Sequence, residues 1–459
     1  MGVRREFNFI LLGMFSIVIL GALGTSIEAE ATTTGSVLFD RSVYPVPWGK
    51  IDDFGGSTGA SDTAGASVFP VHILGISGNV DSDLETLGNG DLVVHIRIFD
   101  PDFNVSAISE DVIAQDVEGQ SFGPVKIKVS RGADFITLGY AGGSTPQDGT
   151  IDVGDNLPNI TRHLGSIQEV GINSGIFQFS FTIRYTDGPD SSNCPETLSF
   201  EPLVGGFGTT ELSRFDVSSQ LGENFCIRNG DTLTVEYTDP LDVNETQTTV
   251  SDSSSFDLRD GLIVTDKSDY LINEFAILTL IDADFDLDRF SSEIHSMDLI
   301  GWKSDAASVS MGANGGNLES FNPIPVNIQE TGDSTGIFQT VIDIPEFVDG
   351  NRVEGEVTLE YQDWSPNFGN FVGEAVKAKT VTISISIPLC VPDSGDWIIS
   401  SSCKVDSDIA AQGNITVTNN ALVTITSGNT LTIGSGNNIT IENGSGVLIK
   451  SGGTLQINS

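Results

Sequence analysis

The fold is decided by the segment FQFSFTI, residues 177–183, in which apolar and polar side chains alternate without a break. The segment VTISISI, residues 381–387, has the same pattern. Successive side chains of a β-strand point to opposite faces of its sheet, so this alternation predicts strands with one buried face. Short strands separated by turns rich in Gly, Asn and Pro predict an all-β chain of immunoglobulin-like β-sandwiches.

Four landmarks occur twice in the same order, which indicates an internal repeat. They are DRSVY at 40–44 and DKSDY at 266–270, DPDFN at 100–104 and DADFD at 282–286, IQE with GIFQ at 167–178 and at 328–339, and EYTD at 236–239 and EYQD at 360–363. The sequence therefore predicts an expanded sandwich over residues 36–259, the first repeat, and a compact one over residues 260–388, the second repeat. Three smaller sandwiches would leave this order unexplained.

The pattern changes after Pro388. Apolar pairs begin every eight residues, with Gly, Asn and Ser between them: Ile415/Val417, Val423/Ile425, Leu431/Ile433, Ile439/Ile441, Val447/Ile449 and Leu455/Ile457. Very short strands in a strict octad predict a short β-solenoid, or β-helix, over residues 389–459. The octads carry little charge up to Ser459, so we expect the last rung to meet another copy or a partner strand. The alternative is that the last rung folds back or that glycans at Asn438 and Asn443 cover it.

Residues 1–31 have the order of a secretory signal peptide. Arg4 and Arg5 form a basic start, an apolar run extends from Phe7 to Leu23, and Ala29-Glu30-Ala31 then places small residues where a signal peptidase cleaves. An uncleaved membrane anchor is the alternative, because the run is near the lower length limit for a span. No later stretch approaches about eighteen consecutive apolar residues, so we expect no membrane span in the mature chain and a place at the cell surface.

The four cysteines are consistent with this exported setting. Proximity favours the disulfides Cys194–Cys226 and Cys390–Cys403, although four cysteines allow three pairings. Zinc is a poor alternative, because no C-x-x-C pair occurs and no His lies beside the cysteines. Six Asn-x-Ser/Thr sequons favour a glycosylated exterior: Asn104, Asn159, Asn244, Asn414, Asn438 and Asn443.

The charge balance is strongly acidic, with 63 acidic residues against 21 basic ones and a formal net charge of −42. Such a surface repels nucleic acid and anionic lipid and attracts cations. A hydrophobic content of 39%, with 26 Phe, is enough for packed cores. The excess carboxylates need counter-ions, for which divalent metal is well suited.

One loop carries alternate carboxylates at the spacing of an EF-hand calcium loop: Asp282, Asp284, Asp286, Asp288 and Glu293. Leu287 stands where that motif has Gly, and residues 275–281 look like a strand. We therefore do not expect a helix-loop-helix here, and expect only that the carboxylates serve as metal ligands. The first repeat has a weaker version of the same pattern: Asp100, Asp102, Asn104 and Asp111. We expect Ca²⁺ at both loops; a solvated acidic turn is the alternative.

Little in the sequence favours an enzyme. The Gly-x-x-Ser/Thr-Gly turns before Phe177 and Phe338 resemble a serine-nucleophile turn, but no His recurs with them. There is no His-Glu-x-x-His, and nothing singles out a glycosidase pair among the carboxylates. About two solenoid turns, at a repeat of some twenty residues, are too few for a polysaccharide lyase. We therefore expect no catalytic residues.

The segment FDRSVYPVPWG, residues 39–49, resembles the mature start of surface-layer proteins from ammonia-oxidising archaea. The recurring Asp-x-Asp-Phe and Gly-Ile-Phe-Gln segments are similar to that family's tandem immunoglobulin-like domains. The tail from Cys390 through Gly395-Asp396-Trp397 is similar to a terminal module of secreted archaeal proteins. The resemblance covers about residues 36–459 and implies a paracrystalline, cation-binding coat without catalysis.

The expected function is thus that of an exported structural envelope protein, a surface-layer or surface-layer-associated component. Its expected partners are other copies of itself, other envelope proteins and cations, but no nucleic acid. This chain departs from the family in being short, with two sandwich repeats. An adhesin or pilus-type binding subunit is the main alternative, and an exported carbohydrate-active enzyme is a further one.

Overall fold

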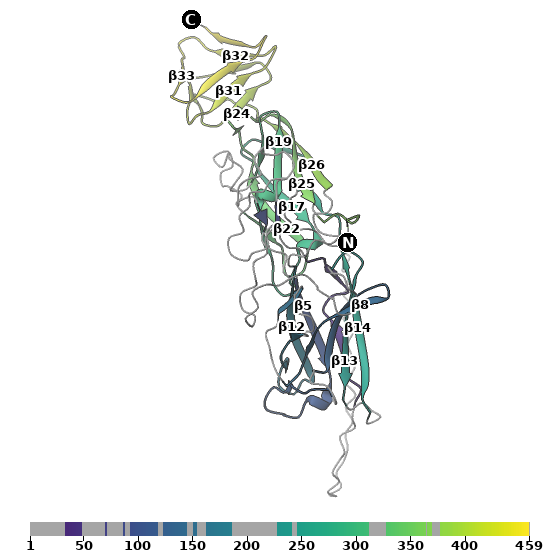
Figure 1. Cartoon of the computed structure of the whole chain (residues 1–459). Coiled ribbons are helices and arrows are strands. Elements are labelled where there is room, and N and C mark those ends of the chain that lie inside the picture. Colours follow the sequence, from purple (N-terminus) through teal and green to yellow (C-terminus); the bar gives the residue numbers. More distant parts are fainter. Residues whose placement is uncertain are drawn as a thin grey trace, which may run out of the picture.

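Strands form almost all the regular structure of the computed structural model (Figure 1). The structure describes residues 33–47, 69–70, 86–87, 92–117, 123–144, 150–153, 162–185, 227–240, 246–311, 327–363, 365–369 and 377–458. Within these ranges the only helical elements are three short 3₁₀ turns: η1 (Pro101–Phe103), η2 (Ala283–Phe285) and η3 (Met297–Leu299). The all-β prediction is confirmed.

Two six-stranded sheets form the first sheet pair. One has the order β1 (Ser36–Phe39), β5 (Leu92–Phe99), β12 (Ile176–Tyr185), β11 (Ile167–Glu169) and β6 (Val112–Ile113), with β9 (Thr150–Val153) beside β12. The other has the order β10 (Arg162–His163), β8 (Asp134–Ala141), β7 (Val125–Arg131), β13 (Thr232–Asp239), β14 (Thr248–Asp257) and β2 (Val43–Pro45).

Two five-stranded sheets form the second sheet pair. One has the order β15 (Leu262–Thr265), β17 (Phe275–Ile281), β22 (Ile337–Asp343), β21 (Asn327–Glu330) and β18 (Ile294–Ser296). The other has the order β16 (Asp269–Leu271), β26 (Lys377–Ser386), β25 (Gly355–Asp363), β19 (Ile300–Ser304) and β20 (Ser308–Ser310). Two small two-stranded sheets pair β23 (Phe347–Val348) with β24 (Asn351–Arg352), and β3 (Phe69–Pro70) with β4 (Thr86–Leu87).

Alternating burial explains why these segments form sheets. Along β12 the side chains of Phe177, Phe181 and Ile183 are buried, as the alternation predicted. The buried faces of both sheet pairs belong to one continuous apolar core that extends from Val37 to Ile387. Each large apolar side chain in it contributes roughly 1.5–3 kcal/mol by leaving water.

The sheet pairs are mainly antiparallel, and each contains the same parallel pairing between a short early strand and its last long strand. In the first pair β2 runs parallel to β14, and in the second pair β16 runs parallel to β26. The tyrosine of each short strand donates its hydroxyl to the aspartate four residues before it, Tyr44 to Asp40 at 2.5 Å and Tyr270 to Asp266 at 2.7 Å. The repeated sequence landmarks thus make repeated contacts.

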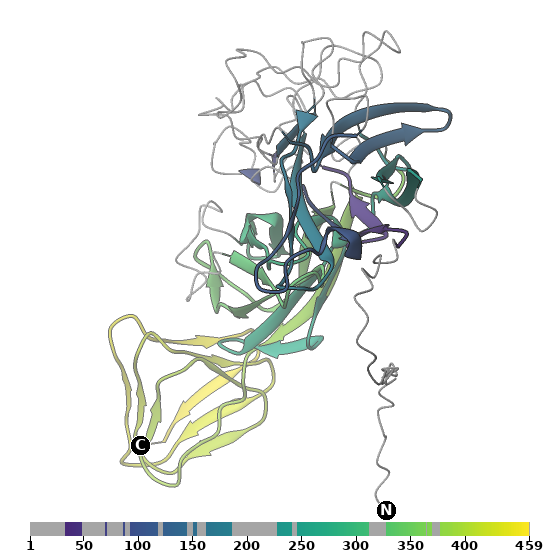
Figure 2. The same ribbon diagram turned by 90° about the horizontal axis from the view of Figure 1, so that it is seen from below.

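Residues 397–457 form a C-terminal coil of three parallel three-stranded sheets, seen at one end of the molecule in Figure 1 and Figure 2. The sheets are β27 (Trp397–Ile399) with β30 (Ile415–Val417) and β33 (Ile439–Ile441), β28 (Cys403–Val405) with β31 (Leu422–Ile425) and β34 (Gly446–Ile449), and β29 (Ile409–Ala411) with β32 (Thr430–Ile433) and β35 (Thr454–Ile457).

Each octad pair of the sequence falls on a strand of this coil. Ile415 pairs with Ile439, 24 residues later, so three octads make one turn. The coil has its own apolar core, separate from that of the sheet pairs. Cys390 and Cys403, which belong to this core, form the predicted disulfide.

Several predictions concern residues outside those that the structure describes. These include the signal peptide over residues 1–31 and the disulfide Cys194–Cys226. Among the described residues, no helix is both long and apolar enough to cross a membrane.

Candidate metal centre

The loop that joins β17 to β18, residues 282–293, holds all five carboxylates of the stronger calcium prediction; we call it the second-repeat loop. It begins with η2, which Asp282 caps by accepting a hydrogen bond from the backbone amide of Asp284 at 2.9 Å. Gly336 lies against this turn with a φ of 59°, and a Cβ on it would sit 2.9 Å from the Cα of Ala283. Only glycine permits that approach.

Asp282 points into the second sheet pair. Its carboxyl group accepts the hydroxyl of Tyr361 at 2.5 Å, while the neighbouring Asp363 accepts the backbone amide of Gly261 at 2.9 Å. Burial, and then the nearby charges of Asp284 and Asp363, raise the pKa of Asp282 well above its ordinary value. Asp282 therefore acts as a buried structural group here.

Asp284 and Asp288 also have partners of their own. Asp284 accepts hydrogen bonds from the backbone amide of Arg259 at 2.7 Å and from its Nε at 3.0 Å. Burial raises the pKa of Asp284 to about 6, against the lowering effect of the Arg259 charge. Asp288 lies 2.8 Å from Nε2 of His95, a residue of the first sheet pair.

The other two carboxylates meet a third that the spacing did not indicate. Ligand atoms of Asp286, Glu293 and Glu330 all lie within 4.8 Å of one another; we call these residues the carboxylate cluster. Asp286 also pairs with Nη2 of Arg41 at 2.7 Å, so one positive charge already faces the cluster.

Backbone amides position the two glutamates. Oε1 of Glu293 accepts the amides of Leu287 at 3.1 Å and Asp288 at 2.8 Å, whereas its buried Oε2 has no hydrogen-bond partner. Oε1 of Glu330 accepts the amide of Gly336 at 2.7 Å. One glutamate oxygen is thus buried beside two other carboxylates, and no amide or hydroxyl donates to it.

The two glutamates titrate in opposite directions. Burial, and then the hydrogen bond to Glu330, raise the pKa of Glu293 to about 8. Burial also opposes the charge on Glu330, but the hydrogen bond from Glu293 and the amides of Gly336 and Thr335 outweigh it and lower the pKa of Glu330. A single proton held between the two carboxylates at neutral pH accounts for both shifts.

This arrangement offers what a hard divalent cation requires. Ca²⁺ binds oxygen ligands at about 2.3–2.6 Å and favours carboxylates, with water filling the remaining positions. A cation at the carboxylate cluster would displace the shared proton and bind the Glu293 oxygen in its place.

The loop between β5 and β6, residues 100–111, is the first-repeat loop and follows the same plan. Asp100 accepts the hydroxyl of Tyr237 at 2.5 Å, and burial raises the pKa of Asp100 to about 6. Asp102 accepts the backbone amide of Thr33 at 3.0 Å. Both carboxylates therefore match the structural roles of Asp282 and Asp284.

The remaining residues of this loop reproduce the carboxylate cluster incompletely. The amide of Asp111 donates to Glu169 at 3.0 Å, as the amide of Glu293 does to Glu330 at 3.4 Å. Asn104 stands in the place of Asp286, which leaves one carboxylate fewer. In the described part of the chain, the only three-residue group of metal-ligand type is the cluster of the second repeat.

Spacing alone did not identify Glu330 or Glu169, although each ends a repeated IQE landmark. Because the landmark recurs beside both acidic loops, its glutamate could have been included. No protein-family model and no curated protein matches this sequence.

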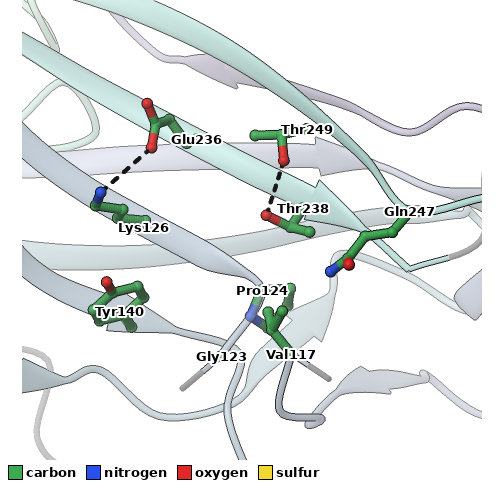
Figure 3. Close-up of a pocket in the computed structure, with 9 residues that line it drawn as sticks. All are labelled: Val117, Gly123, Pro124, Lys126, Tyr140, Glu236, Thr238, Gln247 and Thr249. Carbon is green, nitrogen blue, oxygen red and sulfur yellow. Dashed lines mark hydrogen bonds and ion pairs between the residues drawn. The ribbon is translucent and has the colours of Figure 1, made fainter. Parts of the chain in front are cut away.

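A separate polar cavity of about 400 Å³ lies on the first sheet pair (Figure 3). Its lining residues are Val117, Gly123, Pro124, Lys126, Tyr140, Glu236, Thr238, Gln247 and Thr249. Glu236 is the one carboxylate among them, and both Lys126, at 3.8 Å, and Lys128 pair with it. This lining lacks the two carboxylates on which glycoside hydrolysis depends.

Proposed function

We propose that the chain is an exported structural protein of the cell envelope, a surface-layer or surface-layer-associated component. In this proposal the two sheet pairs are immunoglobulin-like β-sandwiches, and the C-terminal coil is a short β-solenoid. The serial arrangement of these parts in Figure 1 supports it, because rods of this kind suit a coat. The net charge of −42 would concentrate cations there.

The main support for this proposal is the position of the carboxylate cluster at the junction of the two sheet pairs. Asp286 belongs to the cluster, and both its carboxylate and its carbonyl oxygen accept hydrogen bonds from Arg41 at 2.7 Å. A Ca²⁺ ion at the cluster would therefore hold the second-repeat loop in the shape that contacts the first sheet pair. Calcium is thus proposed as a stiffening ion and not as a catalytic one.

Isolated cell envelopes test the proposal directly. We expect electron microscopy to show an ordered coat and mass spectrometry to identify this chain within it. Purified protein should assemble in calcium and disperse in a chelator. Absence of the chain from envelopes would contradict the proposal.

A binding subunit of adhesin or pilus type is the second candidate. Exposed apolar side chains favour it, among them Val391 just before the coil and Ile398 within it. Binding of glycans or cells by the monomer, without assembly, would favour this candidate over a structural coat.

A further inference from the structure

The two acidic loops are equivalent residue by residue. Each has twelve residues, begins with an aspartate bound to a buried tyrosine, and ends with a carboxylate whose amide donates to the landmark glutamate. Asn104 therefore corresponds to Asp286, Val105 to Leu287, and each later residue to its counterpart without a gap.

The second-repeat loop is a docking element within the chain. The amide of Val93 donates to the carbonyl oxygen of Leu287 at 3.0 Å, and Asp288 meets His95 at 2.8 Å. Leu287 is only 9% exposed. The loop thus fits onto the end of the first sheet pair.

An aromatic contact completes this junction. The ring of Phe290 lies 4.5 Å from the imidazole of His95, centroid to centroid, and 6.0 Å from the guanidinium carbon of Arg97. Leu287 and Phe290 are therefore the apolar side chains that the loop presents to its neighbour.

The first-repeat loop presents apolar side chains at the same two positions. Val105 corresponds to Leu287 and is 82% exposed, while Ile108 corresponds to Phe290 and is 88% exposed. Val170 and Ile172, in the adjoining turn, are exposed as well. The loop has the form of a docking element, with four apolar side chains in water.

The second sheet pair carries the matching receiving end. The amide of His95 donates to Asp40 at 3.0 Å, and the amide of Ile277 donates to Asp266 at 2.7 Å. Because these two aspartates are equivalent landmarks, Ile277 occupies the place of His95 in the second repeat.

The neighbouring positions of this receiving end follow from the same alignment. Phe275 takes the place of Val93, because each lies two residues before the aligned position. Lys267 takes the place of Arg41, because each directly follows the landmark aspartate. Phe275 is 60% exposed and Ile277 is 41% exposed with the C-terminal coil in place. The receiving end is therefore open and more apolar than its counterpart.

We propose that the first-repeat loop of one molecule docks on the receiving end of a second molecule, in the manner of the junction inside each chain. Val105 and Ile108 then cover Phe275 and Ile277. In this contact Ser106 and Ile277 stand where the junction inside the chain has Asp288 and His95, so the polar pair is missing from both surfaces. This head-to-tail contact is heterologous and builds open strings.

The inference deepens the proposed function by naming a contact surface between molecules. The inference depends on the proposed function in one respect, namely that the molecules assemble with one another. Presence of the chain in envelopes is tested separately, so either idea can fail alone.

Photo-crosslinking locates the contact. The probe is p-benzoylphenylalanine in place of Ile108, in a mixture of isotopically heavy and light molecules. We expect crosslinks between heavy and light chains to the peptide that contains Phe275 and Ile277. The same probe at Phe290 should crosslink within one chain, to the strand of His95, and serves as the control. Crosslinks from Ile108 to other surfaces alone would overturn the proposal.

Complementary variants test the polarity of the contact by sedimentation velocity. Ile108→Asp disables the first-repeat loop and Phe275→Asp disables the receiving end. Each variant alone should therefore self-associate at least about tenfold more weakly than the wild type. An equimolar mixture should form dimers, because one intact loop meets one intact receiving end. Phe135→Asp, at an exposed site away from both ends, should assemble like the wild type.

Other outcomes contradict the proposal. If Phe275→Asp alone still dimerises while Ile108→Asp does not, the loops meet one another in a symmetric pair. If both variants assemble like the wild type, a different surface is used, and the envelope role is unaffected. A wild-type chain that remains monomeric in calcium also overturns it.

Discussion

Tyr361 donates its hydroxyl to Asp282 at 2.5 Å, and both side chains are buried. The first repeat has the same pair in Tyr237 and Asp100. Burying a polar group costs free energy unless a hydrogen bond replaces the ones it made with water. These pairs therefore fix the entrance of each acidic loop more firmly than exposed carboxylates could.

Tyr361→Phe should lower the free energy of unfolding by about 1–3 kcal/mol, because Asp282 loses its donor while remaining buried. Urea denaturation of the full chain measures this. Tyr237→Phe should cost a similar amount in the first repeat. A change near zero for both variants would show that the pairs contribute nothing.

The protonation of Glu293 makes stability depend on pH. Burial, and then Glu330, raise its pKa in the folded chain from 4.5 to about 8. Because the folded-state pKa lies above the unfolded one, this stabilisation is complete below about pH 4.5 and is lost as pH rises through about 8. In a chelator, the free energy of unfolding should fall over that window.

Glu293→Gln serves as the comparison, since a neutral amide does not titrate. The difference in the free energy of unfolding between the variant and the wild type should change steadily across the window. Parallel pH profiles for the two proteins would contradict the assigned protonation.

At the scale of the element, the second-repeat loop shows what spacing can and cannot predict. Alternation located β12 and β26, and the octads located six of the nine coil strands, because both patterns report local geometry. The partners of the loop carboxylates come from distant segments: Arg41, Arg259 and Tyr361. Such contacts depend on packing, so an EF-hand spacing could not foretell which carboxylates would meet.

Calcium should raise the melting temperature through the carboxylate cluster. The gain in stability is RT ln(1 + [L]/Kd), about 2.7 kcal/mol at a hundred times Kd. Glu330→Gln should remove most of the shift, measured against the same variant in chelator, whereas Glu356→Gln, at an exposed site, should retain it. A full calcium shift in Glu330→Gln would exclude the cluster.

At the scale of the whole molecule, Arg41 connects the two sheet pairs. Its side chain is 9% exposed and its guanidinium donates twice to Asp286. The sequence predicted two repeats, but their junction could not be derived from it, because landmarks describe each repeat and not the surface between them.

Arg41→Ala should loosen this junction, because it leaves the buried Asp286 without its charge partner, a loss of about 3–5 kcal/mol for a buried pair. Small-angle X-ray scattering should show a broader distribution of overall dimensions. Arg289→Ala, at an exposed site on the same loop, is the matched control. Identical scattering from all three proteins would show that Arg41 does not hold the junction.

The parallel pairing of β16 with β26 has a mechanical consequence. β16 lies near the start of the second repeat and β26 at its end, so tension along the chain pulls the two strands in opposite directions. Their hydrogen bonds then bear the load together in shear, and not one after another as in a peeled hairpin. β2 and β14 place the first repeat under the same geometry. Single-molecule pulling should give two high rupture forces and one lower one from the coil.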